Sequence, residues 1–179
     1  MKWRLFFVCA VVYCSSALCS QAKAQTANQY WWHDRLTQAD RNACILRAAL
    51  SFPDNTYVGV ECKEWVQMCV VYPVSRRAVL LPLNSPSCDW MWQWSPDVEV
   101  VARDRWDGVS WPSGEIVQCQ IRTKTGGLSK HTFIIMSTDQ GGVNVIECNL
   151  SNDRQVRHRY VTWANLKTSI THYTLYRVK

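Results

Sequence analysis

The chain has 179 residues, of which 47% are hydrophobic and 19% are charged. This length favours a single domain, and this composition excludes a disordered tail, a collagen-like fibre and a coiled coil. The formal net charge of +6 would suit a nucleic-acid partner, but half of the positive surplus lies within the first 24 residues.

Those first 24 residues are predicted to be a cleaved export signal. A basic start precedes an apolar stretch over 5–19, and Ala22 and Ala24 are the small residues that a signal peptidase recognises. The stretch is short for a membrane-spanning helix, so no stable membrane insertion is expected after cleavage. Three of the 20 basic residues lie in this segment, which leaves 17 against 14 acids in 25–179. A surplus of +3 argues against nucleic acid as the partner.

Cysteine usage is consistent with a periplasmic or extracellular protein. The expected mature chain retains Cys44, Cys62, Cys69, Cys88, Cys119 and Cys148. Six cysteines in an exported protein suggest up to three disulfides. If one cysteine is a catalytic nucleophile, at most two disulfides form and a second thiol is left over.

Helices are predicted in the first half of the expected domain, 25–179. A helix over 37–50 begins with Thr-Gln-Ala-Asp, a capping pattern, and ends before a Pro-Asp-Asn turn. A second helical pattern covers 61–71 and is expected to stop near Pro73. The stretch 74–113 has no clear period and is rich in tryptophan and proline, which predicts a long, partly structured insertion.

An antiparallel sheet is predicted in the last third of the chain. Gly-rich turns separate β-like segments over 115–121, 131–137, 143–149, 156–161 and 173–178, with one helical turn over 163–166. Helices followed by an antiparallel sheet form an α+β arrangement.

Cys62 is the candidate nucleophile. It follows Gly-Val-Glu and lies in the first turn of the second predicted helix. The helix dipole and the unpaired backbone N–H groups of a first turn stabilise a thiolate. Cys69 lies two turns further on, without that field, and is predicted to be in the core. On its position alone, Cys62 fits a buried or disulfide-bonded cysteine better than a nucleophile.

His131 is the candidate base. It opens an apolar strand after a Gly-Gly loop, and strand ends beside loops often carry catalytic groups. If the next hairpin turns at Gln140, His131 lies opposite Asn149 and shares a face with Glu147. A shift of one residue would place Cys148 on that face instead. A cysteine, a histidine and a polar group that fixes its tautomer are the parts of a thiol hydrolase.

Four short motifs support this interpretation. They are Gly-Val-Glu-Cys-Lys-Glu-Trp-Val at 59–66, Gly-Glu-Ile-Val-Gln at 114–118, His-Thr-Phe-Ile-Ile at 131–135 and Val-Ile-Glu-Cys-Asn at 145–149. In this order they resemble the CHAP family of cysteine, histidine-dependent amidohydrolases/peptidases, which is related to NlpC-like cell-wall hydrolases. The family often has Asp in place of Glu115 and Trp in place of Leu150.

The resemblance implies a papain-like fold and residue roles within it. It makes Cys62 the nucleophile, His131 the base, and Glu147 and Asn149 the polar pair that orients the base. It also implies cleavage of amide bonds in the peptide of peptidoglycan, with no metal and no other cofactor. If the protein is a toxin rather than a housekeeping enzyme, an immunity protein is a further partner.

Two other patterns carry weaker predictions. Trp90, Trp92 and Trp94 would share one face of an extended segment and could stack on sugars of the glycan strands, although packing is the commoner role of tryptophan. The basic cluster at 154–159 could contact an anionic substrate, although a solvated strand face is more common. The expected mature chain contains no Cys-x-x-Cys pair and no His-x-x-x-His pair, so no zinc site is predicted.

Two alternative functions remain open from the sequence. A catalytically inactive, disulfide-stabilised secreted binding protein on the same fold would hold Cys62 in a disulfide. An acyl-transfer enzyme would use Cys62 and His131 on a substrate outside the cell wall.

Overall fold

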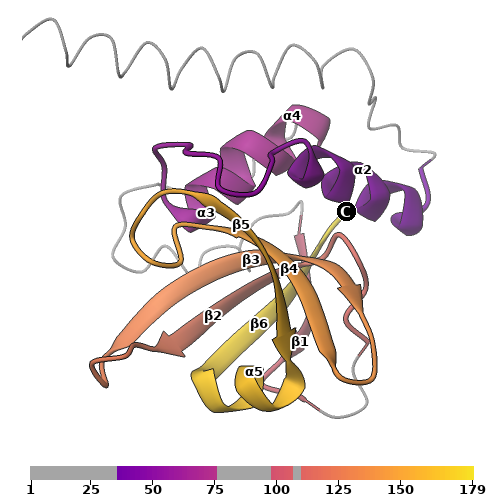
Figure 1. Ribbon diagram of the computed structural model, residues 1–179. Coiled ribbons are helices and arrows are strands. Elements are labelled where there is room, and N and C mark those ends of the chain that lie inside the picture. The colour runs from indigo at the N-terminus through magenta and orange to yellow at the C-terminus, as the bar shows by residue number, and fades with distance from the viewer. Residues whose placement is uncertain (1–35, 76–97, 107–109) are drawn as a thin grey trace, which may run out of the picture.

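The computed structural model describes residues 36–75, 98–106 and 110–179. The predicted export signal lies outside these residues, and so do Trp90, Trp92 and Trp94. Along the described chain, helices come first and an antiparallel sheet follows (Figure 1). The α+β arrangement is therefore confirmed. No helix among the described residues is both long and apolar enough to cross a membrane.

Helix α2 (Gln38–Leu50) begins where the sequence predicts. The Thr37 hydroxyl accepts a hydrogen bond from the Asp40 N–H at 3.2 Å, and the Asp40 carboxylate accepts one from the Thr37 N–H at 3.1 Å. This reciprocal pair satisfies two backbone donors that the first turn leaves unpaired. The buried face of α2, which includes Ile45 and Ala48, packs in the hydrophobic core.

The second helical run is longer than predicted. It consists of α3 (Cys62–Glu64), the π-helix η1 (Trp65–Val71) and α4 (Tyr72–Ser75), which follow one another directly. Pro73 does not stop it. In a regular helix, the proline ring clashes with the carbonyl four residues earlier. The wider π-helical turns before Pro73, with the Tyr72 N–H bonded five residues back to Gln67, relieve that clash.

The sheet has six antiparallel strands in the order β1-β6-β2-β3-β4-β5. Their bounds are β1 (Val98–Arg103), β2 (Ile116–Arg122), β3 (Leu128–Thr138), β4 (Gly142–Cys148), β5 (Val156–Thr162) and β6 (Ile170–Val178), with helix α5 (Trp163–Ser169) between the last two. All but β1 lie where the sequence predicts strands. Alternating apolar residues and Gly-rich turns are local signals, which explains this agreement.

Strand β1 lies within the stretch 74–113, which the sequence predicts to be partly structured. Part of that stretch is regular structure, because β1 pairs with β6 at the edge of the sheet. A shift in register between Val100 and Ala102 interrupts the alternation of side chains, so the sequence of β1 lacks a clean period of two. Trp106 and Trp111 follow β1 and stack on each other, with their ring centroids 5.8 Å apart.

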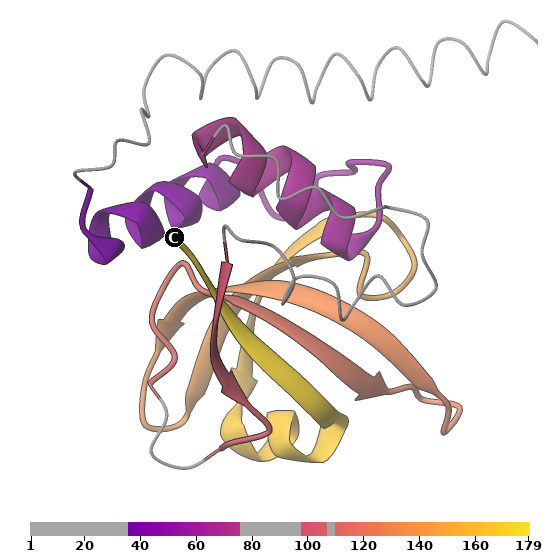
Figure 2. The same cartoon turned by 180° about the vertical axis from the view of Figure 1, so that it is seen from behind.

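Each face of the curved sheet covers a hydrophobic core. Helices α2, α3 and α4 lie together over one side, and α5 lies at the opposite end of the sheet (Figures 1 and 2). The helix-facing core includes Trp65, Val70 and Ile134, and the core of the other face includes Phe133 and Tyr173. Neighbouring residues of β3 thus point into different cores, as a period of two requires.

Candidate active site

The segment that leads into Cys62 is held by the start of β5. The Val58 N–H donates to the carbonyl of Arg154 at 2.9 Å, and the Val156 N–H donates to the carbonyl of Thr56 at 2.8 Å. These bonds fix the chain just before the helical run, so that Cys62 is its first residue. The sequence-based placement of Cys62 at a helix N-terminus is confirmed.

Asn149 lies in the connection between β4 and β5, with a left-handed φ of 61°. Its side-chain amide donates to the Glu61 carboxylate, and its carbonyl oxygen accepts from the Arg154 N–H at 2.8 Å. The hydrogen bonds of Asn149 therefore go to the residue before Cys62 and to its own loop, not to His131. The structure does not bring Asn149 together with the base in the way the sequence predicts.

His131 and Glu147 meet across neighbouring strands. Glu147 of β4 lies directly opposite Phe133 of β3, two residues beyond His131, so both side chains point to one face. His131 Nε2 and Glu147 Oε2 are 2.7 Å apart. Both side chains are buried, with exposed fractions of 4% and 1%. The structure brings His131 and Glu147 together, as the sequence predicts.

The register at this pair depends on a bulge that the sequence does not reveal. Near the turn, Thr138 lies opposite Val143, one residue out of step with a turn centred on Gln140. A shift in register between Ile135 and Ser137 then restores the expected pairing nearer to His131. Without that bulge, Cys148 would share the face of the base.

Cys62 completes the group on the other side of the imidazole. The Cys62 side chain is hydrogen-bonded to His131, and since Nε2 contacts Glu147, Nδ1 is the ring nitrogen left for the thiol. Burial works against a charged ring, but the hydrogen bonds to Cys62 and Glu147 outweigh it and raise the pKa of His131 to about 9. An imidazolium is therefore favoured beside the Glu147 carboxylate.

Glu147 has a second cationic partner, which the sequence analysis missed. Arg159 of β5 contacts Glu147 Oε1 through its Nε, while Oε2 contacts His131. Burial opposes ionisation of Glu147, yet His131 and Arg159 together hold the pKa of this carboxyl below its usual value. Arg159 lies opposite Val145 and so shares the face of Glu147. The sequence could have indicated this contact only if the register between β4 and β5 had been known.

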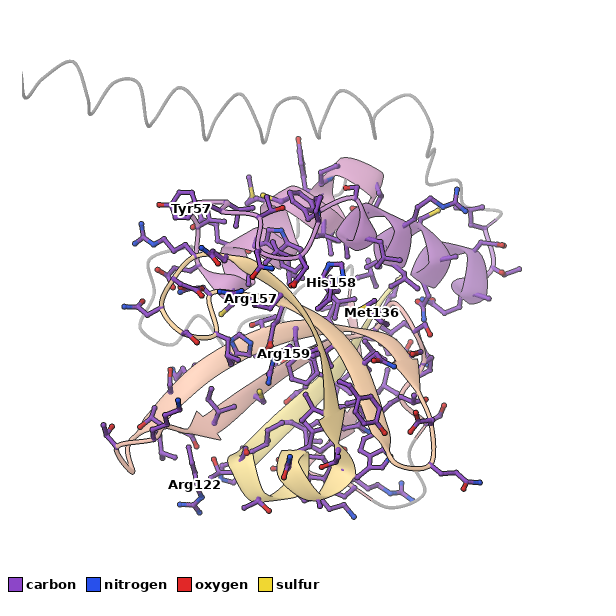
Figure 3. The ribbon with its side chains drawn as sticks, in the orientation of Figure 1. Tyr57, Arg122, Met136, Arg157, His158 and Arg159 are labelled. Carbon is purple, nitrogen blue, oxygen red and sulfur yellow. The ribbon has the colours of Figure 1, made fainter. Side chains whose placement is uncertain are left out.

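The basic side chains of β5 lie on a partly exposed strand face and have polar partners (Figure 3). Arg157 lies 2.9 Å from the Asp153 carboxylate, and the His158 ring contacts the Phe52 carbonyl at 3.0 Å. Together with Arg159, these residues hold the loops around the site. The exposed fractions of Arg157 and Arg159, 33% and 41%, agree with the solvated strand face that the sequence favours.

The other thiols differ from Cys62 in their surroundings. Cys148 is fully buried and its Sγ donates to the Val60 carbonyl at 3.5 Å. Burial raises the pKa of Cys148 to about 12, and burial also raises the pKa of Cys44. Cys62 is a free thiol, half-buried, and next to the base. Cys69 lies in the core as predicted, and Cys88 lies outside the described residues.

A cavity of about 320 Å³ lies against the histidine–glutamate pair. Its lining combines apolar side chains such as Phe133 and Val145 with Glu147 and Arg159. Within the described residues, no three His, Cys, Asp or Glu side chains form a group that could hold a metal ion.

The titration of His131 gives a first testable prediction. The ring should remain protonated up to about pH 9 in the protein as it stands. In Cys62→Ala the midpoint should fall by more than about one unit, because the hydrogen bond to Cys62 leads the interactions that raise the pKa of His131. Imidazole NMR shifts followed against pH measure both midpoints. Equal midpoints in the two proteins would contradict the Cys62–His131 contact.

Comparisons with known proteins bear on the fold only. No family model matches the chain, and no curated protein matches it. A structure of Ly7917 with the hydrolyzing product of MDP is 17% identical over 79% of this chain and 63% of that chain, with a TM-score of 0.50. A second structure of Ly7917 is 17% identical over 77% and 62%, with a TM-score of 0.46. The chain thus spans less than two thirds of Ly7917.

Proposed function

We propose that the protein is an exported thiol hydrolase of the CHAP family with a papain-like fold, an amidase or endopeptidase that cleaves amide bonds in the peptide of peptidoglycan. One observation carries the proposal. The free thiol of Cys62 at a helix start, the buried imidazole of His131 and the buried carboxylate of Glu147 form one continuous hydrogen-bonded chain. These are the nucleophile, base and orienting group of a thiol hydrolase.

The reaction follows from this order of groups. The Cys62 thiolate attacks the amide carbonyl and forms a carbon–sulfur bond, while negative charge develops on the carbonyl oxygen. The backbone N–H of Cys62, unpaired within its own helix, is placed to stabilise that oxygen. The protonated His131 then gives its proton to the leaving amine as the carbon–nitrogen bond breaks. A thioester between substrate and Cys62 results.

Hydrolysis of the thioester reverses the use of the base. His131, now neutral, accepts a proton from a water molecule, which attacks the thioester carbonyl and releases the acid product and the Cys62 thiolate. Glu147 keeps the ring oriented through both steps, because its contact with Nε2 leaves Nδ1 directed at the reacting atoms. Glu147 therefore has the role of orienting His131, which the sequence analysis assigned to Glu147 and Asn149 together.

The substrate class rests on the motif resemblance and on the kind of site. The structure of Ly7917 has been determined with the hydrolyzing product of MDP. At 17% identity, the similarity to Ly7917 supports the fold alone. The predicted export signal supports a substrate outside the cytoplasm. An immunity protein as partner is part of this proposal only if the protein acts as a toxin.

Digestion of purified peptidoglycan tests the proposal. We expect the purified protein to release fragments whose masses, measured by mass spectrometry, identify the amide bond that was cleaved. Cys62→Ala should release none above background, because Cys62 is the thiol that is hydrogen-bonded to His131. Cys44→Ser is the matched control, since it removes a half-buried thiol on α2, and it should cleave at the rate of the unmodified chain.

Other results would point to the alternatives. Equal cleavage by Cys62→Ala would contradict the proposed nucleophile. No cleavage by protein whose Cys62 is free, as shown by its reaction with iodoacetamide in a separate sample, would favour acyl transfer to a substrate outside the wall. No cleavage together with Cys62 locked in a disulfide would favour the binding protein.

A further inference from the structure

We propose that Arg159 is a positioning residue for the catalytic base and that it acts through Glu147. This inference rests on the proposed function for its meaning in catalysis, but not for its test. Arg159 contacts Glu147 Oε1, and the other oxygen of the same carboxylate lies 2.7 Å from His131 Nε2. Arg159 is thus one carboxylate away from the imidazole.

The charges around His131 alternate in sign. In the reactive state they are the Cys62 thiolate, the His131 imidazolium, the Glu147 carboxylate and the Arg159 guanidinium, which sum to zero. Glu147 is only 1% exposed, and a buried carboxylate without sufficient positive charge takes up a proton. Removing Arg159 leaves one net negative charge in this buried group and makes protonation of Glu147 the nearest way to neutralise it.

The position of the Arg159 guanidinium also orients the Glu147 carboxylate. With Arg159 on Oε1, the remaining oxygen is the one presented to the ring, so the carboxylate has one preferred rotation. Arg159 is itself 41% exposed and lines the cavity that lies against Glu147. Glu147 lines the same cavity, so Arg159 and the carboxylate that it contacts face one space.

The sign of the effect on pH dependence follows. Arg159 lowers the pKa of Glu147, so its removal raises that pKa. As the pH falls, Glu147 then becomes protonated earlier, the His131 imidazolium loses its counter-ion and the thiolate–imidazolium pair weakens. The acid limb of Cys62 reactivity, which is the pH range over which reactivity is lost on acidification, therefore moves to higher pH. Reactivity near pH 8, where Glu147 is ionised in both proteins, changes little.

Alkylation of Cys62 by iodoacetamide, measured against pH, tests this without any substrate. In Arg159→Gln the acid limb should move up by at least about one pH unit, the lower end of the effect of an adjacent opposite charge. Arg159→Lys keeps the charge and should recover most of the shift. Arg157→Gln is the matched control, because Arg157 lies directly opposite Glu147 on the same strand as Arg159 but its guanidinium pairs with Asp153 (Figure 3). It should leave the acid limb in place.

Two results would overturn the inference. One is a folded Arg159→Gln protein with the acid limb of the unmodified chain, and the other is an equal shift in Arg157→Gln. If Arg159→Gln does not fold, the Glu147 carboxyl ¹³C shift in the unmodified protein decides, since a midpoint at or above 4.5 contradicts the role of Arg159. Failure to cleave peptidoglycan would reject the proposed substrate and leave each of these results unchanged.

Discussion

His131→Gln is expected to reduce kcat/KM for peptidoglycan cleavage by about 10²- to 10⁴-fold, the usual contribution of general acid–base catalysis. Glutamine keeps polar atoms at the site but cannot carry the proton from the Cys62 thiol to the leaving amine. Alkylation of Cys62 by iodoacetamide at pH 7 should slow as well, because the imidazolium that stabilises the thiolate is gone.

A matched control variant, His172→Gln, separates a catalytic role of His131 from general damage to the protein. His172 also faces a carboxylate, Asp104 at 3.1 Å, but on the exposed surface, and its loss should leave both rates unchanged. A fall in activity with His172→Gln equal to that with His131→Gln would show that the assay reports general damage.

Gly114→Ala is expected to destabilise the fold by on the order of 3–5 kcal/mol, which combines backbone strain with overpacking. Gly114 has a φ of +81°, and a Cβ there would lie 2.7 Å from the carbonyl carbon of Asn42 in α2 and overlap its oxygen. Neither group yields easily, because both belong to backbone. Thermal unfolding should show Tm lowered by roughly 10 °C.

Gly126→Ala isolates the part of that effect due to φ. Gly126 has nearly the same φ of +84°, but nothing lies within 4 Å of its would-be Cβ. Its replacement should cost only about 1–2 kcal/mol, the penalty of a left-handed alanine. If the two variants lost the same stability, the close approach of α2 to the chain before β2 would not be the cause.

Local patterns predicted most of the secondary structure. Thr37 and Asp40 cap α2 through contacts three residues apart, and the turns between the strands use glycine and asparagine where the backbone needs them. Interactions between residues close in sequence are readable from the sequence, because their geometry depends on the local backbone alone. Strand β1 escaped prediction because its irregular pairing with β6, which lies far along the chain, obscures its period.

The candidate site was partly predictable for the same reason. Cys62 at a helix start is a local property, and His131 meets Glu147 through one short hairpin. Even here, the pairing of His131 with Glu147 depends on two features that the sequence did not predict. The turn is displaced by one residue from Gln140, and a bulge in the hairpin restores the expected register. A shift of one residue in the strand register changes which side chain of β4 lies on the face of His131.

The sequence by itself determined the order of elements, the helix that begins at Cys62 and the strand that carries His131. Only the tertiary structure decided the partners of Glu147 and Asn149. Arg159 reaches Glu147 because β5 pairs with β4, and Asn149 reaches Glu61 because its loop lies against the start of the helical run. These contacts join segments whose relative position follows from packing of the whole sheet and its helices, which no local pattern encodes.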